Sequence, residues 1–258
     1  MLEICGRSDL LLLSPRTPHL PLTSSSSPPP RSFLVFSRLQ VPKELTVKEI
    51  LEIEDQFVAA AKRAVTAGCQ ALEIHAAHGY LIHQFCSPHT NHRTDQYGGS
   101  FENRSRFLFE VSQSVRAAVP STLLFVRLTG FDAVPGGWTM EEAVKASRIL
   151  RDLGVDLIDI SSGSVVPMAD RMVTSGPGYQ IEDAARVRKE AAIPTGAVGK
   201  IDSVEMAEWV IAEGKADLVF QARETLRNPY FPFHAAQVLG VKDFLRTPVQ
   251  YERRINKL

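Results

Sequence analysis

The sequence predicts an α/β protein with a parallel sheet of the (β/α)-barrel type, in which five strands alternate with helices. Short apolar runs alternate with amphipathic segments of about 10–15 residues, the pattern of βαβ units. No Gly-x-Gly-x-x-Gly motif follows any of the five runs, which disfavours a dinucleotide-binding open sheet. Polar residues stand instead at the strand ends, where a barrel builds its active site. They are His75, Arg127, Ser161, Gly199 and Arg223.

The first predicted helix begins at a capping box, in which Thr46 accepts a backbone hydrogen bond and Glu49 reaches back to it. Apolar residues follow at helical spacing between Ile50 and Val65. Gly68 is expected to end the helix in the left-handed conformation. The apolar run at 71–75 then predicts the first strand.

The same order of elements repeats along the chain. The other predicted strands are residues 123–128, 157–161, 195–198 and 218–221. Expected helix starts are a cap at Ser100, a capping box at Thr139–Glu142, a helix near 182–191, a cap at Asp202–Glu205 and a proline-led helix at Asn228–Pro229. Two of these helices are expected to end at Gly154 and Gly214.

The first 40 residues differ in character from residues 41–258. They contain four consecutive serines (24–27) and three prolines (28–30), and the one strand-like run in them is 33–36. We expect residues 1–40 to be a low-complexity, disordered tail and residues 41–258 to fold. The serine content also fits a transit peptide, but Glu3 and Asp9 count against that interpretation.

Charge and cysteine content limit the partners and the compartment. The 29 basic and 29 acidic residues balance, so nothing favours nucleic acid or an anionic membrane surface as a partner. No apolar run is close to the length of about 18 residues that a membrane span needs. The apolar run 10–13 is also too short for the core of a signal peptide. Three widely spaced cysteines (Cys5, Cys69 and Cys86) are typical of reduced thiols, so we expect a cytoplasmic protein.

The densest candidate site is the segment 73–80. Strand alternation places Glu73 and His75 on one face, so His75 points into the barrel if the opposite, apolar face meets the helices. A turn would bring His78 to the same side. Two neutral imidazoles can donate hydrogen bonds to one oxygen and stabilise a developing enolate, and the phenol of Tyr80 can supply a proton.

Other interpretations of these residues stay open at this point. A strand-end histidine is commonly a hydrogen-bonded polar residue without chemical function. A metal site would use the nearby His83, His89 and His92, and it would need Glu73 or Asp95 because no cysteine joins them.

Arg127 ends the second predicted strand, where a buried cation needs an anionic or electron-rich partner. An ion pair with Glu73 or Asp159 would satisfy it equally well. The last two predicted strands are followed by TGAVGK (195–200) and QAR (221–223). Loops at these barrel positions commonly bind phosphate, and Arg223 would add a bidentate contact.

Together these motifs resemble the old yellow enzyme family, and its bacterial-type, thermophilic-like branch most. The most specific stretch is HAAHGYLIHQFCSPHTNHRTDQYGGSFENRSR (75–106), followed in order by FVRLTGFD, LIDISSG, TGAVGK, ADLVFQARETLRNP and PVQYER. The resemblance covers about residues 41–253. It implies a TIM barrel that binds FMN, receives electrons from NADPH or NADH, and reduces the C=C bond of an α,β-unsaturated carbonyl compound (an enone).

The resemblance also implies roles for single residues. His75 and His78 would bind the substrate carbonyl oxygen, and Tyr80 would protonate the α-carbon. Arg127 would lie by the pyrimidine side of the flavin, and Arg253 would reach a neighbouring subunit's site in a homo-oligomer. The residues implied to hold the FMN phosphate are Gly199, Ala222 and Arg223.

Two features depart from the family's pattern. Ala222 stands where the family has glycine, and its methyl group would fit or crowd the phosphate depending on φ. The family's first three βα units would precede Thr46, where the tail lies instead, so we expect only the last five units of an N-terminally truncated member. Five strands leave two open edges, and the run 33–36 is long enough to cover one of them but not to replace three βα units. We therefore expect weak FMN binding, and a non-catalytic remnant is the alternative function.

Overall fold

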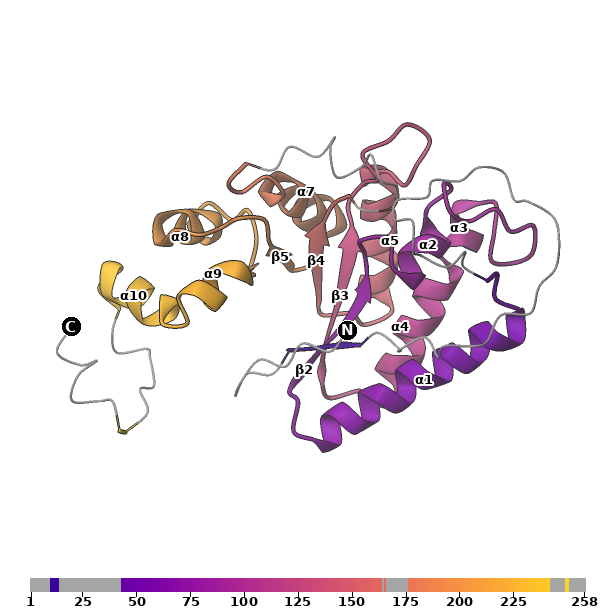
Figure 1. The fold of residues 1–258 in the computed structure, drawn as a ribbon, viewed down its shortest axis with the longest axis horizontal. Helices are drawn as coiled ribbons and strands as arrows, with labels where there is room; N and C mark the ends of the chain where they lie inside the picture. Colours follow the sequence, from indigo (N-terminus) through magenta and orange to yellow (C-terminus); the bar gives the residue numbers. More distant parts are fainter. Residues whose placement is uncertain (1–9, 14–42, 164, 166–175, 242–248, 251–258) are drawn as a thin grey trace.

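The computed structural model describes residues 10–13, 43–163, 165, 176–241 and 249–250 of the chain (Figure 1). Its strands are β1 (Leu10–Leu13), β2 (Ala71–Ala76), β3 (Leu123–Thr129), β4 (Leu157–Ser161), β5 (Thr195–Ala197) and β6 (Leu218–Val219). Its helices are α1 (Val47–Thr66), α2 (Leu81–Cys86), α3 (Phe101–Arg104), α4 (Arg106–Ala118), α5 (Met140–Asp152), α7 (Ile181–Ala191), α8 (Val204–Ala212), α9 (Arg223–Arg227) and α10 (Phe231–Val238). Figure 1 shows α1, α4 and α5 alongside the central strands, and α8–α10 together beyond β5.

The six described strands form one sheet in the order β1-β2-β3-β4-β5-β6, and every neighbouring pair is parallel. A doubly wound sheet reverses its strand order at one point, whereas a barrel winds in one direction. Strand order does not reverse anywhere in this sheet. The prediction of a barrel-type fold rather than an open doubly wound sheet is therefore confirmed.

The five predicted strands are β2 to β6. β4 matches the prediction, β2 and β3 extend one residue further, and β5 and β6 end before the predicted residues 198 and 221. The sixth strand, β1, was not predicted, so the expectation that 33–36 is the one strand-like run in the tail is wrong. β1 pairs with β2 along 71–74 because β2 would otherwise present a row of unpaired backbone groups. Residues 33–36 lie outside the described residues.

Three of the predicted capping signals are confirmed. Thr46 and Glu49 form the predicted capping box at α1, with Glu49 Oε2 accepting from Thr46 N at 2.8 Å. Thr139 and Glu142 form the second one at α5. Ser100 caps α3, which is a separate short helix from α4 because the chain turns at residue 105.

Two predicted helix starts are wrong. Ser203, not Asp202, caps α8, because its hydroxyl is the one that accepts a backbone N–H of the first turn. α10 starts at Phe231 with Pro232 in its first turn, so Pro229 is not its first residue. Residues 228–231 form a turn ahead of the helix, closed by a hydrogen bond between the backbone groups of its ends.

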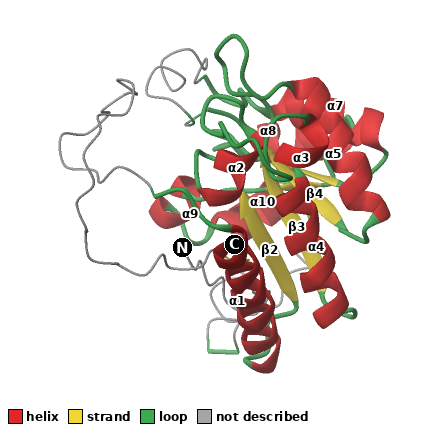
Figure 2. Ribbon diagram, turned by 90° about the vertical axis from the view of Figure 1, so that its right-hand side faces the viewer, coloured by secondary structure: helices red, strands yellow, loops and turns green. Residues whose placement is uncertain are grey.

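Alternation along the strands separates a core from an inner face. The outward side chains of β2, β3 and β4 are fully buried under the helices; they are Leu72, Ile74, Leu124, Val126, Ile158 and Ile160. Each such side chain stabilises the fold by about 1.5–3 kcal/mol. In Figure 2 the helices α1, α4 and α5 lie in front of these strands. The inner face carries polar residues instead, with His75, Arg127 and Asp159 in register across three strands.

Candidate functional site

The candidate site begins at the C-terminal end of β2 and continues onto β3 and β4. His75 lies beside Arg127, and Thr129 lies beside Ser161, at successive levels of the inner face. In a parallel sheet the ends of neighbouring strands meet at one edge. Three of the five predicted strand-end residues, His75, Arg127 and Ser161, are therefore brought together.

The turn after β2 has an unusual backbone conformation. His78 and Gly79 both have positive φ, 58° and 73°. A residue with a Cβ in this region costs roughly 1 kcal/mol or more, so surrounding contacts must hold it. His78 N donates to Thr129 Oγ1 at 3.1 Å, Gly79 N donates to His83 Nδ1 at 2.8 Å, and Gln84 Nε2 donates to Gly79 O at 2.7 Å.

The two imidazoles form part of a directional chain of hydrogen bonds. Ala77 N donates to His75 Nδ1 at 3.2 Å, so neutral His75 carries its proton on Nε2. That nitrogen lies 3.3 Å from His78 Nδ1, and His78 Nε2 lies 2.5 Å from Ser161 Oγ. Ser161 in turn donates to Gln180 Oε1 at 3.1 Å. The pattern assigns both histidines the Nε2–H tautomer, with the donors aimed in sequence toward Gln180.

Both histidines are neutral at neutral pH. Burial, followed by the nearby Arg127 charge, lowers the pKa of His75 to about 4. The same causes lower the pKa of His78 to about 3. Neutral imidazoles act as hydrogen-bond donors without adding a positive charge to the site.

His75, His78 and Tyr80 lie together as the sequence predicted, and their catalytic roles remain predictions. The two imidazole rings meet edge to face with centroids 5.1 Å apart. Tyr80 packs against His75 with centroids also 5.1 Å apart, and its side chain is 52% exposed. In the described structure the imidazole N–H groups point to protein acceptors rather than to one shared position. A carbonyl oxygen would therefore have to replace Ser161 as the acceptor for His78.

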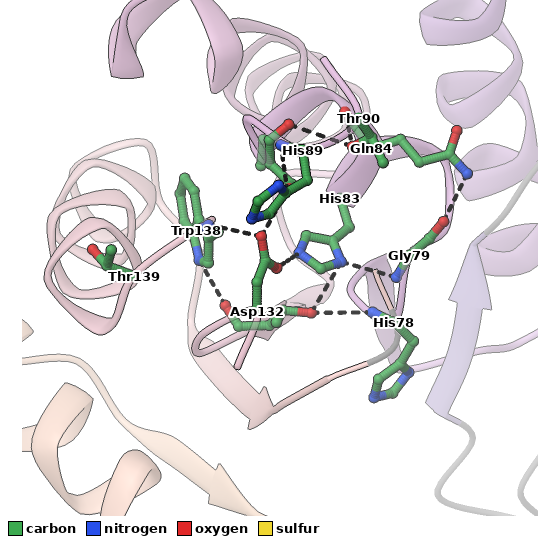
Figure 3. A network of polar contacts seen from close by, with 12 residues as sticks. His78, Gly79, His83, Gln84, His89, Thr90, Asp132, Trp138 and Thr139 are labelled. Atoms are coloured by element: carbon green, nitrogen blue, oxygen red, sulfur yellow. Dashed lines mark hydrogen bonds and ion pairs between the residues drawn. The ribbon is translucent and has the colours of Figure 1, made fainter. Parts of the chain in front are cut away.

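Beneath the turn lies a buried network, drawn in Figure 3. His83 Nε2 lies 2.8 Å from Asp132 Oδ1. The other oxygen of Asp132 accepts from Ser87 Oγ at 2.6 Å and from Trp138 N at 2.7 Å. Burial opposes the ionisation of Asp132, but these hydrogen bonds outweigh it and keep its pKa below the usual value.

Sequence reasoning missed this network. It considered His83 only as a metal ligand, and it did not single out Asp132 or Gln180. The available signal was position: Asp132 follows β3 within the family motif FVRLTGFD, among the other strand-end residues. Its partner is 49 residues away, so spacing alone does not connect them.

Arg127 has the ion-pair partner that one interpretation foresaw. Its Nε lies 3.2 Å from Asp159 Oδ2, and Asp159 is almost fully buried. Burial raises the pKa of Asp159, while Arg127 and a hydrogen bond with Glu73 work in the opposite direction. Arg127 therefore has the buried carboxylate of Asp159 as its ion-pair partner, and its own side chain remains 20% exposed.

At the phosphate loops, Gly199 has a φ of 123°. A Cβ added there would lie 3.0 Å from Tyr179 Cε1 and 3.1 Å from Gln180 Nε2. Gln180 also donates to Val198 O at 3.1 Å, so it joins this loop to the hydrogen-bond chain of the histidines. The prediction of a special glycine at this position is physically justified, although its role in binding is a separate matter.

Ala222 precedes α9 with φ −116°, a conformation that alanine adopts readily. The concern that its backbone would require glycine is therefore removed. Arg223 is the first residue of α9 and is exposed. Arg253, predicted to reach another subunit, lies outside the described residues.

Residues 91–97, within the stretch that carries most of the family resemblance, form a scaffold. Asn91 Nδ2 donates to Phe85 O and Tyr97 O at 2.6 and 2.7 Å. Arg93 donates two hydrogen bonds to Asp95 and a third to the carbonyl oxygen of Leu45, which lies just before α1. Within the described residues, no group of three or more His, Cys, Asp or Glu could hold a metal ion.

Comparison with known proteins identifies the family. Residues 23–241 match the NADH:flavin oxidoreductase / NADH oxidase family, and the chain belongs to it. It is 50% identical over 212 residues to an NADPH dehydrogenase of Geobacillus thermodenitrificans (strain NG80-2), covering 82% of this chain and 61% of the relative. An NADPH dehydrogenase of Geobacillus sp. (strain WCH70) is 48% identical over 223 residues, covering 86% and 64%. The chain thus spans less than two thirds of the length of these relatives.

Solved structures agree with the family and the fold. The old yellow enzyme homologue from Zymomonas mobilis has a TM-score of 0.64 and 28% identity, covering 82% of this chain and 57% of that one. Morphinone reductase in complex with tetrahydroNAD has a TM-score of 0.62 and 29% identity, covering 78% and 52%. The old yellow enzyme resemblance and the barrel type predicted from the sequence are both confirmed.

The described residues suit the flavin nucleotide that this family uses. Gly199 has a φ of 123°, and a Cβ there would meet Tyr179 and Gln180, so this loop takes a backbone path that requires glycine. Arg127, held by Asp159 on the inner face, offers a fixed positive charge for an electron-rich ring. Phosphate and ring contacts therefore have candidate residues on separate strands of the same sheet.

Proposed function

We propose that the chain is an FMN-dependent oxidoreductase that reduces the C=C bond of an α,β-unsaturated carbonyl compound, with NADPH or NADH as the electron source. The observation that carries the proposal is the neutral His75–His78 pair at the end of β2, next to Arg127 on β3. Family membership supports the flavin and the nicotinamide nucleotide, and the histidine pair supports the substrate class.

Each candidate residue has a defined task in this proposal. FMN, when bound, supplies the hydride that adds to the β-carbon of the enone. The Nε2–H of His78 leaves Ser161 and the Nε2–H of His75 leaves His78 Nδ1, and both donate to the substrate carbonyl oxygen, which stabilises the enolate. Tyr80, half-exposed beside His75, donates the proton to the α-carbon.

The cofactor-binding residues complete the assignment. Arg127, paired with Asp159, would supply a positive charge to the pyrimidine side of the flavin ring. Gly199 lets the backbone approach the phosphate, and Ala222 and Arg223 contribute a backbone N–H and a charge at the start of α9. The function thus draws on the ends of four strands of the sheet.

A non-catalytic remnant with weak or no flavin binding is the second candidate. It is favoured by one observation: the described sheet has six strands, against eight in a closed barrel. An incomplete wall would lower FMN affinity even with the phosphate and ring residues in place.

FMN titration of the full chain, followed by desalting and an absorbance spectrum, separates the two. Retained flavin together with NADPH-dependent reduction of cyclohexenone supports the enzyme. Flavin lost on desalting, with no reduction at saturating FMN, supports the remnant. In an active chain, His78→Ala should lower kcat/KM about 100-fold. His92→Ala, at an exposed histidine of the same segment, is the matched control and should leave it unchanged.

Cellular setting and assembly are also proposals. We place the protein in the cytoplasm, where the thiols of Cys69 and Cys86 remain reduced. We found no described helix with the length and apolar character to cross a membrane. A homo-oligomer formed through the segment near Arg253, with a small-molecule enone as substrate and no nucleic-acid or membrane partner, completes the proposal.

A further inference from the structure

The buried pair His83–Asp132 has no task in the proposed reaction, yet it contacts the turn that carries His78. His83 is 1% exposed and Asp132 is fully buried. Figure 3 shows His83 between the carboxylate of Asp132 and the backbone of Gly79. The pair therefore joins α2 and the loop after β3 to the backbone of the candidate site.

Hydrogen-bond directions determine the tautomer of His83. Its Nδ1 accepts Gly79 N–H at 2.8 Å and lies 3.3 Å from Thr129 Oγ1. A nitrogen that accepts a backbone N–H carries no proton, so the proton is on Nε2. Nε2–H donates to Asp132 Oδ1 at 2.8 Å. A protonated Nδ1 would oppose Gly79 N–H and break the contact with the turn.

Asp132 is well suited to impose that tautomer. Ser87 Oγ–H and Trp138 N–H occupy its Oδ2, which leaves Oδ1 facing His83 as an acceptor. A carboxylate in this position admits only a donor on the imidazole nitrogen opposite it. The Asp132 carboxylate at Nε2 of His83 thus leaves Nδ1, on the other side of the ring, as a hydrogen-bond acceptor.

The turn needs such an acceptor because two of its residues have positive φ. His78 N is held by Thr129 Oγ1, and Gly79 N is held by His83. With both held, the His78 side chain reaches His75 and Ser161. Loss of the hydrogen bond from Gly79 N to His83 would free the backbone that orients the imidazole of His78.

We propose that Asp132 and His83 are positioning residues: Asp132 keeps His83 in the Nε2–H tautomer, and His83 thereby holds the turn at 78–79 that orients His78. The importance of His78 for catalysis rests on the proposed function. The positioning itself is a property of the chain without any ligand, so it is testable separately.

The first test reads the tautomers directly by NMR of ring nitrogens in the full chain labelled with ¹⁵N-histidine. We expect the proton of His83 to lie on Nε2 and its Nδ1 to carry none. In Asp132→Asn, the fixed Trp138 N–H claims the amide oxygen, so the amide NH₂ faces His83. His83 should then change to the Nδ1–H tautomer, and the ring-nitrogen signals of His78 should shift with it. Wild-type His83 protonated on Nδ1, or unchanged His78 signals in Asp132→Asn, would overturn the proposal.

The second test separates positioning from stability with two substitutions at His83. Asn places its polar atoms near the position of Nδ1, so His83→Asn can still accept Gly79 N–H but loses Asp132. Gln reaches the position of Nε2, so His83→Gln can keep Asp132 but loses Gly79. The Asn variant should be the less stable one in urea, and yet its tautomers at His78 should remain those of the wild type.

Activity should follow the same order if the chain reduces cyclohexenone. We expect His83→Gln to lower kcat/KM about 10- to 100-fold, and His83→Asn to retain most of it. Activity that follows stability instead would make the pair merely structural. If the wild type has no activity, the proposed function fails, while the NMR result on His78 still decides the positioning.

Discussion

The two ends of the candidate site are held in different ways. The histidine end, residues 75–83 with 129–132 and Ser161, is tied together by side chains from several segments. The phosphate end, residues 196–200 and 220–227, has fewer such links: Gln180 donates to Val198 O, and Gln221 donates to Ile201 O. α9 has no buried residue, and Leu226 is 83% exposed. Several buried side chains therefore preorganise the histidines, whereas the phosphate end has fewer side-chain links and an exposed final helix.

This difference bears on what each end contributes. Oriented donors need fixed directions, which buried hydrogen bonds provide. Phosphate binding needs accessible N–H groups and a cation, which a short exposed helix start can offer. Gln180 connects the two, because its oxygen accepts from Ser161 and its nitrogen donates to Val198 O. A change at one end can thus reach the other through a single buried side chain.

The largest expected effect is on acid stability at the histidine end. The folded pKa values of His75 and His78, about 4 and 3, lie below the ordinary histidine pKa of 6.5 because both rings are buried near Arg127. Between pH 6.5 and about 4 the unfolded chain binds more protons, so stability is full above pH 6.5 and falls as the pH falls. For His78 alone, lowering the pH from about 6.5 to about 4.5 should reduce the free energy of unfolding by about 2–3 kcal/mol.

Urea unfolding near pH 6.5 and near pH 4.5 measures this difference. His78→Asn should remove about that much of the pH dependence, and asparagine tolerates the positive φ at this position. His234→Asn in α10, at an exposed histidine outside the histidine end, is the control. Equal pH dependence in wild type and His78→Asn would show that His78 is not held neutral by burial.

Most of the fold was predictable because its signals are local. Capping boxes such as Thr46–Glu49 and the alternation of β2 act within a few residues. β1 was missed because its stability comes from pairing with a segment about 60 residues away, Leu10 with Ala71. The cap at Asp202 was predicted wrongly because the adjacent Ser203 can also accept a backbone hydrogen bond at a helix start.

The site was predictable to the extent that it follows the strands. Alternation placed His75 and Arg127 on the inner face, and the turn placed His78 beside them. The direction of each imidazole N–H and the partnership of His83 with Asp132 were not predictable. Both features depend on backbone torsions and on contacts between distant segments. Such contacts produce no regular spacing of residues that could be recognised in the sequence.

The next prediction compares two residues of the phosphate end. Gly199→Ala should lower the free energy of unfolding by about 1–2 kcal/mol, because φ is 123° and the new Cβ would meet Tyr179 and Gln180. Ala222→Gly, where φ is −116°, should cost only about 0.5 kcal/mol through added freedom of the unfolded chain. Urea unfolding of both variants gives the comparison, and equal losses would refute a special backbone at 199.

The smallest effect is expected at Leu226 in α9. It is exposed in the structure, so Leu226→Ala removes little buried surface and should change the free energy of unfolding by less than about 0.5 kcal/mol. The measurement is urea unfolding at two protein concentrations. A loss above about 1 kcal/mol that grows with concentration would mean that another copy of the chain covers this leucine. The phosphate end would then be held by assembly, and its contrast with the histidine end would disappear in the oligomer.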